Sequence, residues 1–310
     1  MSIVSSRFTG LIAAPFTPFH TDGSVNLAVI PAYARFLKER GVSAVFVCGT
    51  TGEGASLSVE ERELITEAWI QVAALPVIVH VGHTSLPDAR RLSSHAAKHG
   101  AAAFAALAPF FFKPRNPAEL ADWCAAVASA APSLPFYYYH IPSMTGVSMP
   151  VLDVLKSAAG RIPNLAGVKY THEDLPDFTA CLRHENHRFD LLFGRDEMLF
   201  EGTEAGSRGA VGSTYNYASP LYLRLLAALT AGDRAQARVH QDQSIAMIAA
   251  CNGIGVTHLA ASKAVMAWLG IDCGPVRAPL AQPTPAQLAA LRPQLEARGF
   301  FTPGFGQAPK

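Results

Sequence analysis

The feature that most constrains this chain is a repeated alternation of short apolar runs with longer stretches of helical spacing. A short apolar run followed by a turn and a helix-like stretch is typical of a βα unit in a parallel sheet. Eight such runs occur at spacings of roughly 20 to 35 residues, at 11–14, 44–47, 77–81, 103–108, 136–139, 166–169, 191–193 and 209–212. The pattern therefore predicts eight parallel strands.

Helices are expected between these runs, among them 26–39, 59–73, 87–98, 117–130 and 220–231. One has a clear start signal, because Ser58 and Glu61 have the spacing of a capping box before an apolar periodic segment. Ser58 is therefore expected to be the N-cap of the second helix.

Eight βα units within about 230 of the 310 residues predict a (β/α)8 TIM barrel, an α/β fold. An open doubly wound sheet would need a glycine-rich phosphate-binding turn after its first strand, and the sequence has none. Beyond residue 232 strand signals stop and helices are expected at 234–252, 257–269 and 285–298. We therefore divide the chain into a barrel at 1–232 and a C-terminal helical region at 233–310, with the proline-rich segment 273–285 as a surface linker.

Composition narrows the class of protein. Half of the residues are hydrophobic and only 16% are charged, which indicates a large buried core and leaves room for buried subunit contacts. The formal charge is +1 with no basic run, so a nucleic-acid partner is not expected. The first ten residues lack an export signal, and the longest apolar stretch, 101–112, is too short to span a membrane.

The five cysteines are scattered and contain no C-x-x-C pair. They indicate neither a disulfide framework nor a thiolate metal site, and a cytoplasmic location fits them best. The sequence also has no H-E-x-x-H, P-loop or dinucleotide-binding pattern, and the histidine pairs at 80/83 and 184/187 have no third ligand at a recognisable spacing. We therefore expect neither a metal nor another cofactor.

In a barrel the working residues lie at the carboxyl ends of the strands. Lys169 ends the sixth predicted strand, where it would point into or over the barrel. An ordinary lysine has only about one amine in 10³ uncharged at pH 7, so burial that lowers its pKa would make it a competent nucleophile for Schiff-base chemistry. The alternative is a rim lysine whose head group reaches water.

Other strand ends carry polar groups as well. Tyr139, in the run of three tyrosines that ends the fifth strand, could relay protons beside Lys169, or it could only pack in the strand. Thr50 and Thr51, in the segment GTTGE, could bind a carboxylate, or they could cap a turn that Glu53 holds.

Asp196 and Glu197 follow the seventh strand, and Ser213 follows the eighth. The two carboxylates and the hydroxyl could hydrogen-bond the hydroxyls of a polyol, or the acidic pair could only mark the start of a helix.

Five segments together, GTTGE, YYYHIPSMTG, GVKYT, FGRDE and GAVGSTYNY, resemble the motifs of the dihydrodipicolinate synthase superfamily, and in particular its N-acetylneuraminate lyase branch. The resemblance runs in the same order from about residue 10 to about residue 280. It implies a class I aldolase without a cofactor that reversibly cleaves a 2-oxo sugar acid to pyruvate and an N-acyl hexosamine. It also implies a homotetramer.

The same resemblance implies individual roles. Lys169 would form the Schiff base, Tyr139 would relay protons, and Thr50 and Thr51 would bind the pyruvate carboxylate. The sugar end would be lined by Thr171, Gly194, Asp196, Glu197 and Ser213.

Three positions depart from the pattern or have no assigned role. Met144 replaces the arginine that binds the second substrate of the synthases, which favours the lyase reading. Phe111 stands where many relatives have a tyrosine that reaches a neighbouring active site, and a phenylalanine cannot transfer a proton. Arg195 is expected to be exposed or paired with an aspartate.

Two other functions stay open at this point. A related lysine-imine aldolase or dehydratase would act on a 2-keto-3-deoxy sugar acid. A barrel that only senses pyruvate or a sugar acid would retain the cavity without turnover.

Overall fold

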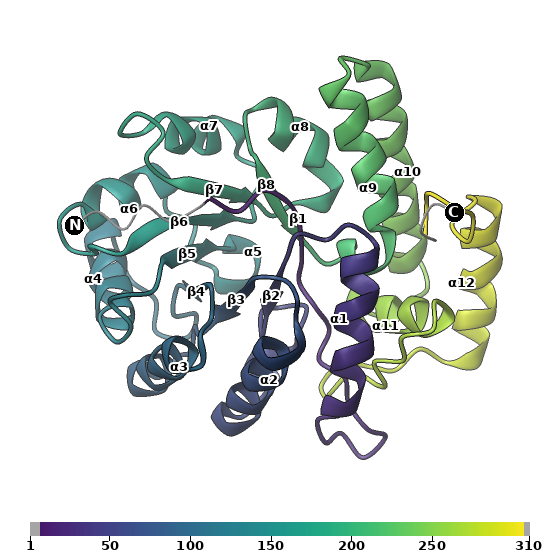
Figure 1. The fold of residues 1–310 in the computed structure, drawn as a ribbon, viewed down its shortest axis with the longest axis horizontal. Helices are drawn as coiled ribbons and strands as arrows, with labels where there is room; N and C mark the ends of the chain where they lie inside the picture. The colour runs from purple at the N-terminus through teal and green to yellow at the C-terminus, as the bar shows by residue number, and fades with distance from the viewer. Residues whose placement is uncertain (1–6, 307–310) are drawn as a thin grey trace.

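The chain forms a closed barrel of eight parallel strands in a computed structural model that describes residues 7–306 (Figure 1). Consecutive strands are neighbours throughout, and β1 closes the barrel by pairing with β8 through Gly10 and Gly209. The predicted TIM barrel is thus confirmed. The strands are β1 (Gly10–Ala13), β2 (Ala44–Val47), β3 (Val77–His80), β4 (Ala103–Leu107), β5 (Phe136–His140), β6 (Leu165–Tyr170), β7 (Asp190–Phe193) and β8 (Gly209–Gly212).

Both faces of each strand are buried, which explains why the strands appear in the sequence as continuous apolar runs. Alternate residues point into the barrel, where Phe46, Ile78, Tyr137 and Leu192 belong to one cluster, while their neighbours pack under the surrounding helices. Tyr137 and Tyr139 face the interior and Tyr138 faces outward, as strand alternation predicts.

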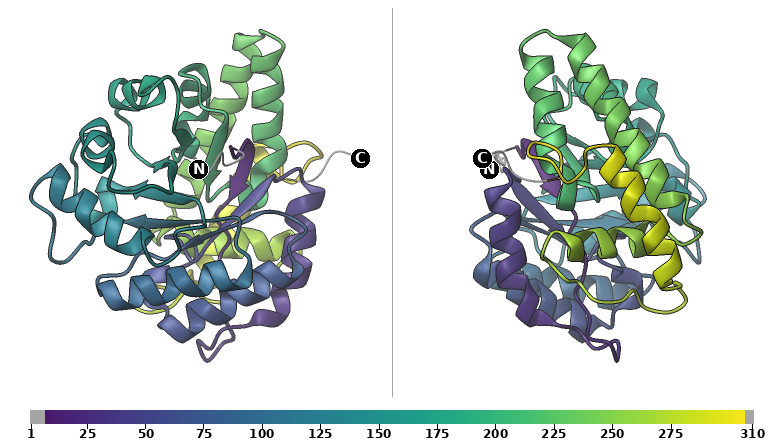
Figure 2. Two further views of the ribbon diagram at one scale, coloured as in Figure 1. Left: turned by 60° about the vertical axis from the view of Figure 1, so that its left-hand side comes forward. Right: turned by 90° about the vertical axis from the view of Figure 1, so that its right-hand side faces the viewer.

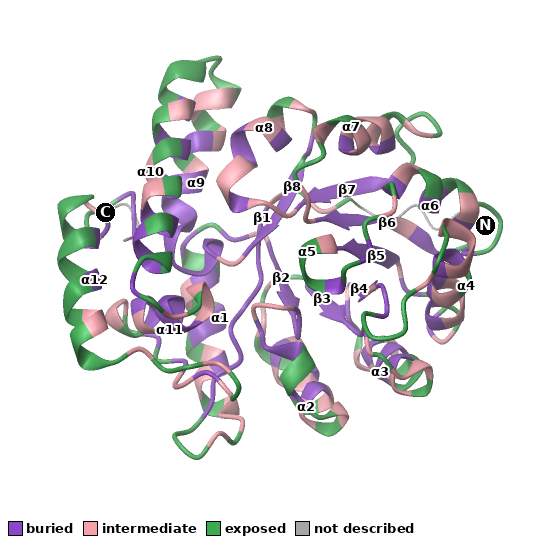
Figure 3. Ribbon diagram, turned by 180° about the vertical axis from the view of Figure 1, so that it is seen from behind, coloured by how far each residue is buried: buried purple, intermediate pink, exposed green. Residues whose placement is uncertain are grey.

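Helices surround the barrel with a buried inner side and an exposed outer side (Figure 3). The capping box is confirmed, because Ser58 and Glu61 each bond the other's backbone N–H at the start of α2. The surrounding helices are α1 (Ile30–Glu39), α2 (Val59–Val72), α3 (Leu86–His99), α4 (Pro117–Ala128), the short α5 (Pro142–Thr145), α6 (Val151–Ala158), α7 (Leu175–Arg183), α8 (Leu199–Glu204) and α9 (Tyr215–Thr230).

Helix α9 begins earlier than the sequence predicts, at Tyr215 rather than at Pro220. The backbone at Ala218, with φ −121° and ψ 16°, interrupts the helical geometry two residues before Pro220. Proline has no N–H to donate and restricts the residue before it, so a short first turn and the predicted helix meet at a kink.

Three further helices follow the barrel: α10 (Arg234–Asn252), α11 (His258–Trp268) and α12 (Pro285–Ala297). They gather on one side of the molecule, where α10 packs against both α9 and α12 (Figure 2). As in the sequence-based expectation, no strand occurs after β8 among the residues described.

The segment 273–285 is not a free surface linker, and that prediction was wrong in its first half. Cys273 and Val276 are buried, and the Arg277 guanidinium donates to backbone carbonyls of Gly23 and Ser56. Prolines prevent regular structure here but do not prevent packing, so this segment fastens α11 to the barrel.

Within 7–306, no helix is both long enough and apolar enough to cross a membrane. The first six residues, part of the region for which we expect no export signal, lie outside the described residues.

Candidate active site

The nine residues singled out from the sequence line one cavity of about 240 Å³ at the carboxyl ends of the strands. The structure therefore brings all of them together, although they come from five different strand ends. They are Thr50, Thr51, Tyr139, Lys169, Thr171, Gly194, Asp196, Glu197 and Ser213.

Lys169 lies on β6 with only 4% of its surface exposed. Its Nζ is 4.0 Å from the centre of the Phe46 ring and 4.1 Å from the centre of the Tyr139 ring. Burial lowers the pKa of Lys169 to about 7, and the nearby Asp196 carboxylate opposes this shift only in part. A large fraction of the amine is therefore uncharged near neutral pH, as a nucleophilic lysine requires.

Tyr139 lies on β5 directly beside Lys169, because the two residues are register partners in the sheet. Neighbouring partners in a parallel sheet point to the same side, so both side chains enter the barrel. The Tyr139 hydroxyl lies 3.2 Å from the Thr50 hydroxyl, and burial raises the pKa of Tyr139 to about 12. The phenol is therefore protonated at neutral pH and can donate a proton or a hydrogen bond.

Thr50 and Thr51 lie in a tight turn that follows β2. The turn is bounded by Cys48 and Glu53, which have positive φ angles of 58° and 55°. Non-glycine residues adopt this left-handed region only when surrounding contacts enforce it. The turn thus holds the two threonine hydroxyls at the mouth of the barrel.

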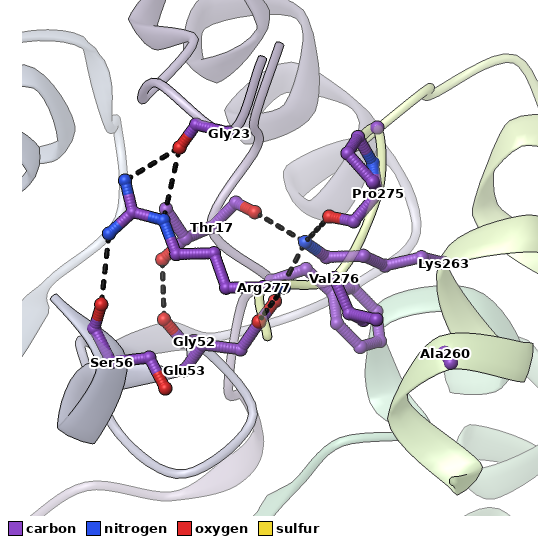
Figure 4. Close-up of polar contacts among 12 residues, drawn as sticks. Thr17, Gly23, Gly52, Glu53, Ser56, Ala260, Lys263, Pro275, Val276 and Arg277 are labelled. Carbon is purple, nitrogen blue, oxygen red and sulfur yellow. Dashed lines mark hydrogen bonds and ion pairs between the residues drawn. The ribbon is translucent and has the colours of Figure 1, made fainter. Parts of the chain in front are cut away.

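A buried ion pair provides that enforcing contact (Figure 4). The Glu53 carboxylate lies 2.8 Å from Nζ of Lys263 on α11, with the two side chains 2% and 3% exposed. Lys263 also donates to the backbone carbonyls of Thr17 and Pro275, at 2.9 and 2.7 Å. The other Glu53 oxygen accepts the Arg277 backbone N–H at 2.8 Å. The C-terminal helices therefore help to hold the threonine turn.

Asp196 is buried just beyond β7, in the first turn that leaves the strand. One carboxylate oxygen accepts the backbone N–H of Thr214 at 2.9 Å and its hydroxyl at 2.7 Å. Burial, together with the neighbouring Glu197 charge, raises the pKa of Asp196 to about 6. The backbone of Gly212 passes so close that a Cβ there would lie 2.2 Å from the other Asp196 oxygen. The carboxylate is thus fixed by the end of β8.

Thr171 follows β6, and its buried hydroxyl lies near the Tyr139 phenol but makes no hydrogen bond of good geometry with any described residue. A buried polar atom without a partner is costly, so an unsatisfied hydroxyl that lines a cavity is a candidate ligand contact. A Cβ at Gly194 would lie 2.1 Å from this hydroxyl oxygen. Only glycine therefore leaves room for the Thr171 side chain at this position.

Arg195 is neither freely exposed nor paired with an aspartate, so that expectation was wrong. Its guanidinium lies 2.9 Å from a carboxylate oxygen of Glu173 and 3.7 Å from one of Glu197, with 32% of its side chain exposed. Asp196 is turned inward towards Thr214, which leaves the two glutamates at the rim as its partners. The arginine thus links the rim of the cavity to the segment after β6.

Sequence reasoning missed the residues that the C-terminal helices contribute to the cavity. Ile248 and Asn252 of α10 and His258 of α11 line the same cavity as Lys169. The His258 ring lies within hydrogen-bonding distance of Asn252 Oδ1 and the Tyr217 hydroxyl, at 3.1 and 3.2 Å. No motif marks these residues, because the helices enter the site only through tertiary packing.

A closed (β/α)8 barrel with a buried lysine of lowered pKa at its mouth has the arrangement of a Schiff-base enzyme. The model of the dihydrodipicolinate synthetase family matches residues 7–298, and the chain therefore belongs to this family. The superfamily resemblance inferred from the five segments is thus confirmed.

Particular relatives extend this assignment. The chain is 40% identical over 310 residues to N-acetylneuraminate lyase of Rattus norvegicus, covering 97% of this chain and 96% of the relative. It is similar in structure to Proteus mirabilis N-acetylneuraminate lyase, with a TM-score of 0.92, 41% identity and coverage of 96% of this chain and 100% of that one. The sialic acid aldolase from Aliivibrio salmonicida is also similar, with a TM-score of 0.91, 38% identity and coverage of 96% and 99%.

Proposed function

We propose that this protein is a Schiff-base aldolase that reversibly cleaves N-acetylneuraminate to N-acetylmannosamine and pyruvate. The observation that carries the proposal is the buried Lys169 amine, whose pKa is lowered to about 7 beside the Tyr139 phenol. Relatives named N-acetylneuraminate lyase at 40% identity over nearly the whole chain support the choice of substrate.

The reaction follows from the chemistry of these groups. The neutral Lys169 amine attacks the 2-oxo carbon, and the phenol of Tyr139 donates the proton with which the carbinolamine hydroxyl leaves as water. The cationic iminium then accepts the electron pair of the carbon–carbon bond beyond the methylene group. The Tyr139 phenolate left by the dehydration step takes the sugar's hydroxyl proton as the aldehyde forms, which restores the phenol. Protonation of the enamine and addition of water release pyruvate and restore the amine.

Substrate binding divides between the two ends of the cavity. Thr50 and Thr51 bind the carboxylate next to the reacting carbon through hydroxyl and backbone donors. The uncharged hydroxyls of the sugar contact Thr171, Asp196, Glu197 and Ser213. Gly194 also lines this end and leaves room for the Thr171 side chain. The unpartnered Thr171 hydroxyl supports this division.

Borohydride trapping with pyruvate tests the imine. The wild-type chain is expected to gain one reduced pyruvate adduct at Lys169, detected by peptide mass spectrometry, and Lys169→Ala is expected to gain none and lose turnover. Lys156→Ala is the matched control, because Lys156 is an exposed lysine with 57% of its side chain accessible. An adduct-free wild-type chain, with turnover retained in Lys169→Ala, would refute the proposal.

A substrate panel separates the alternatives that share this cavity. Pyruvate release from N-acetylneuraminate is expected to exceed release from 2-keto-3-deoxy sugar acids, because Asp196 and Glu197 suit a long polyhydroxyl tail. The reverse order would assign the protein to a deoxy-acid substrate. Saturable binding of these acids with no pyruvate formed would make it a sensor.

We also propose a homotetramer in the cytoplasm. Phe111 and Phe112 are 74% and 86% exposed beside the mouth of the barrel, and exposed aromatic patches are typical of subunit contacts. The five cysteines are free and buried, which fits a reducing compartment. Light scattering coupled to size exclusion is expected to give four chains, and Phe111→Ser with Phe112→Ser is expected to lower that number.

A further inference from the structure

A cluster of three potential metal ligands lies on the outer wall of the barrel, away from the catalytic cavity. Glu67 projects from α2, and His95 and His99 project from α3. We propose that these three residues form a binding site for a divalent transition-metal ion such as Zn²⁺, with water as the remaining ligand. Glu67 is 45% exposed and the two histidine side chains are 13% and 29% exposed, so an ion can reach them from solvent.

The spacing of the ligand atoms fits a tetrahedral ion. One Glu67 oxygen lies 2.9 Å from Nε2 of His95 and 3.7 Å from Nε2 of His99, and the three ligand atoms lie within 4.8 Å of one another. Ligands at about 2.0–2.1 Å around a tetrahedral Zn²⁺ are separated by about 3.3 Å. The separations of 2.9 and 3.7 Å lie on either side of this value, so small side-chain rotations bring the three atoms into coordination.

The two histidines are already arranged for joint binding. They stand four residues apart on one helix, which places them on the same face. Their rings stack with centroids 4.2 Å apart and an angle of 24° between the planes. Nε2 of each ring faces the same Glu67 oxygen. A metal ion bound between these three atoms would take the place of the proton that His95 and Glu67 share, and the surrounding surface would not need to rearrange.

The chemistry of the donor set defines the class of ion. Two imidazole nitrogens and one carboxylate oxygen favour Zn²⁺, Ni²⁺ or Cu²⁺ over Mg²⁺ and Ca²⁺, which prefer oxygen ligands alone. The five cysteine thiols are buried and so do not compete for added ion. Nδ1 of His95 is buried without a hydrogen-bond partner, and Lys98 places a positive charge near Glu67. Both features weaken binding, so we expect a dissociation constant in the micromolar range.

The proposed metal site and the reacting groups lie at opposite ends of the barrel. Helix α3 returns from the carboxyl end of β3 to the amino end of β4, and His99 lies in its last turn, just before β4 begins at Ala103. Lys169 acts at the opposite end of the barrel. Bound metal would therefore link α2 to α3 and stabilise the base of the barrel, without entering the aldol chemistry.

Calorimetric titration with ZnCl₂, on protein from which any affinity tag has been removed, tests the site. We expect one ion per chain, no heat of binding with MgCl₂, and at least a tenfold weaker affinity in both His99→Gln and Glu67→Gln. The matched control is His20→Gln, because His20 is an exposed histidine outside the cluster. This control variant should retain wild-type affinity.

Thermal unfolding supplies a second readout. Zn²⁺ at concentrations above the dissociation constant should raise the melting temperature of the wild-type chain and of His20→Gln, but not that of His99→Gln. Turnover measured without metal confirms that each variant is folded. The proposal is overturned if wild-type protein binds no Zn²⁺, or if Glu67→Gln and His99→Gln bind it as tightly as the control.

Discussion

Replacement of Lys263 by methionine tests how the C-terminal helices stabilise the threonine turn. Methionine retains the length and the apolar stem of the side chain but removes the ammonium group. The change leaves the Glu53 carboxylate buried without its counter-ion, and it removes the donor to the carbonyls of Thr17 and Pro275 (Figure 4).

The magnitude follows from the burial of both partners. Removal of one member of a buried ion pair costs about 3–5 kcal/mol, because the remaining charge is desolvated and uncompensated. In the double variant Lys263→Met with Glu53→Gln no buried charge remains, although the two carbonyls still lack a donor. We therefore expect the double variant to be more stable than Lys263→Met, with a coupling free energy of about 2 kcal/mol or more in the double-mutant cycle.

Urea unfolding at a fixed chain concentration measures these free energies, since assembly makes stability depend on concentration. The matched control is Lys156→Met, because Lys156 and Asp153 form an exposed pair, 57% and 52% accessible, with a separation of 3.5 Å. An exposed pair of this kind contributes about 0–1 kcal/mol. A loss in Lys263→Met no larger than the loss in Lys156→Met would refute the reasoning.

The same variant has an expected effect on activity. The Glu53 backbone N–H donates to the carbonyl of Thr50 at 3.0 Å, so displacement of Glu53 shifts the turn that carries the two threonine hydroxyls. In the synthetic direction we expect KM for pyruvate to rise roughly tenfold, equivalent to about 1.4 kcal/mol. A larger effect on kcat than on KM would contradict this role.

Three further predictions concern the catalytic cavity. Trace acetylation by isotopic acetic anhydride should give Lys169 a reactivity that rises to a plateau around its pKa of about 7. The lysine of a short reference peptide should still gain reactivity up to about pH 10. Parallel profiles for the two amines would contradict the lowered pKa of Lys169. Because burial raises the pKa of Asp196 to about 6 from 3.8, its ionisation destabilises the folded state above pH 6. Asp196→Asn should therefore stabilise the protein by about 1–3 kcal/mol in urea unfolding at pH 8, with little change at pH 4 and reduced turnover; equal effects at the two pH values would refute this. Gly194→Ala places a Cβ 2.1 Å from the Thr171 hydroxyl oxygen and so displaces that hydroxyl. We expect kcat/KM for the sugar acid to fall at least tenfold. An unchanged kcat/KM would show that Thr171 does not bind substrate.

Much of the architecture could be predicted because it depends on local periodicity. The eight apolar runs correspond to the eight strands within one residue at each end. Lys169, Tyr139 and the threonine turn all lie at the carboxyl ends of predicted strands. This shared position predicted that they would line one site. The extra helical turn before Pro220 was not predicted, because a proline usually marks the first turn of a helix. The packing of Cys273 and Val276 was not predicted because it depends on contacts with distant elements.

The sequence by itself thus determined the barrel and the kinds of residues at its mouth, since strand alternation and helical spacing arise from hydrogen bonding and burial among near neighbours. Only the tertiary structure decided the protonation of Lys169, because its lowered pKa depends on desolvation among rings from β2 and β5. Packing of the helices likewise decided that Lys263 of α11 contacts Glu53, and that Glu67 of α2 lies beside His95 and His99 of α3. Contacts of this kind depend on how separate helices and strands pack together, which no local sequence pattern encodes.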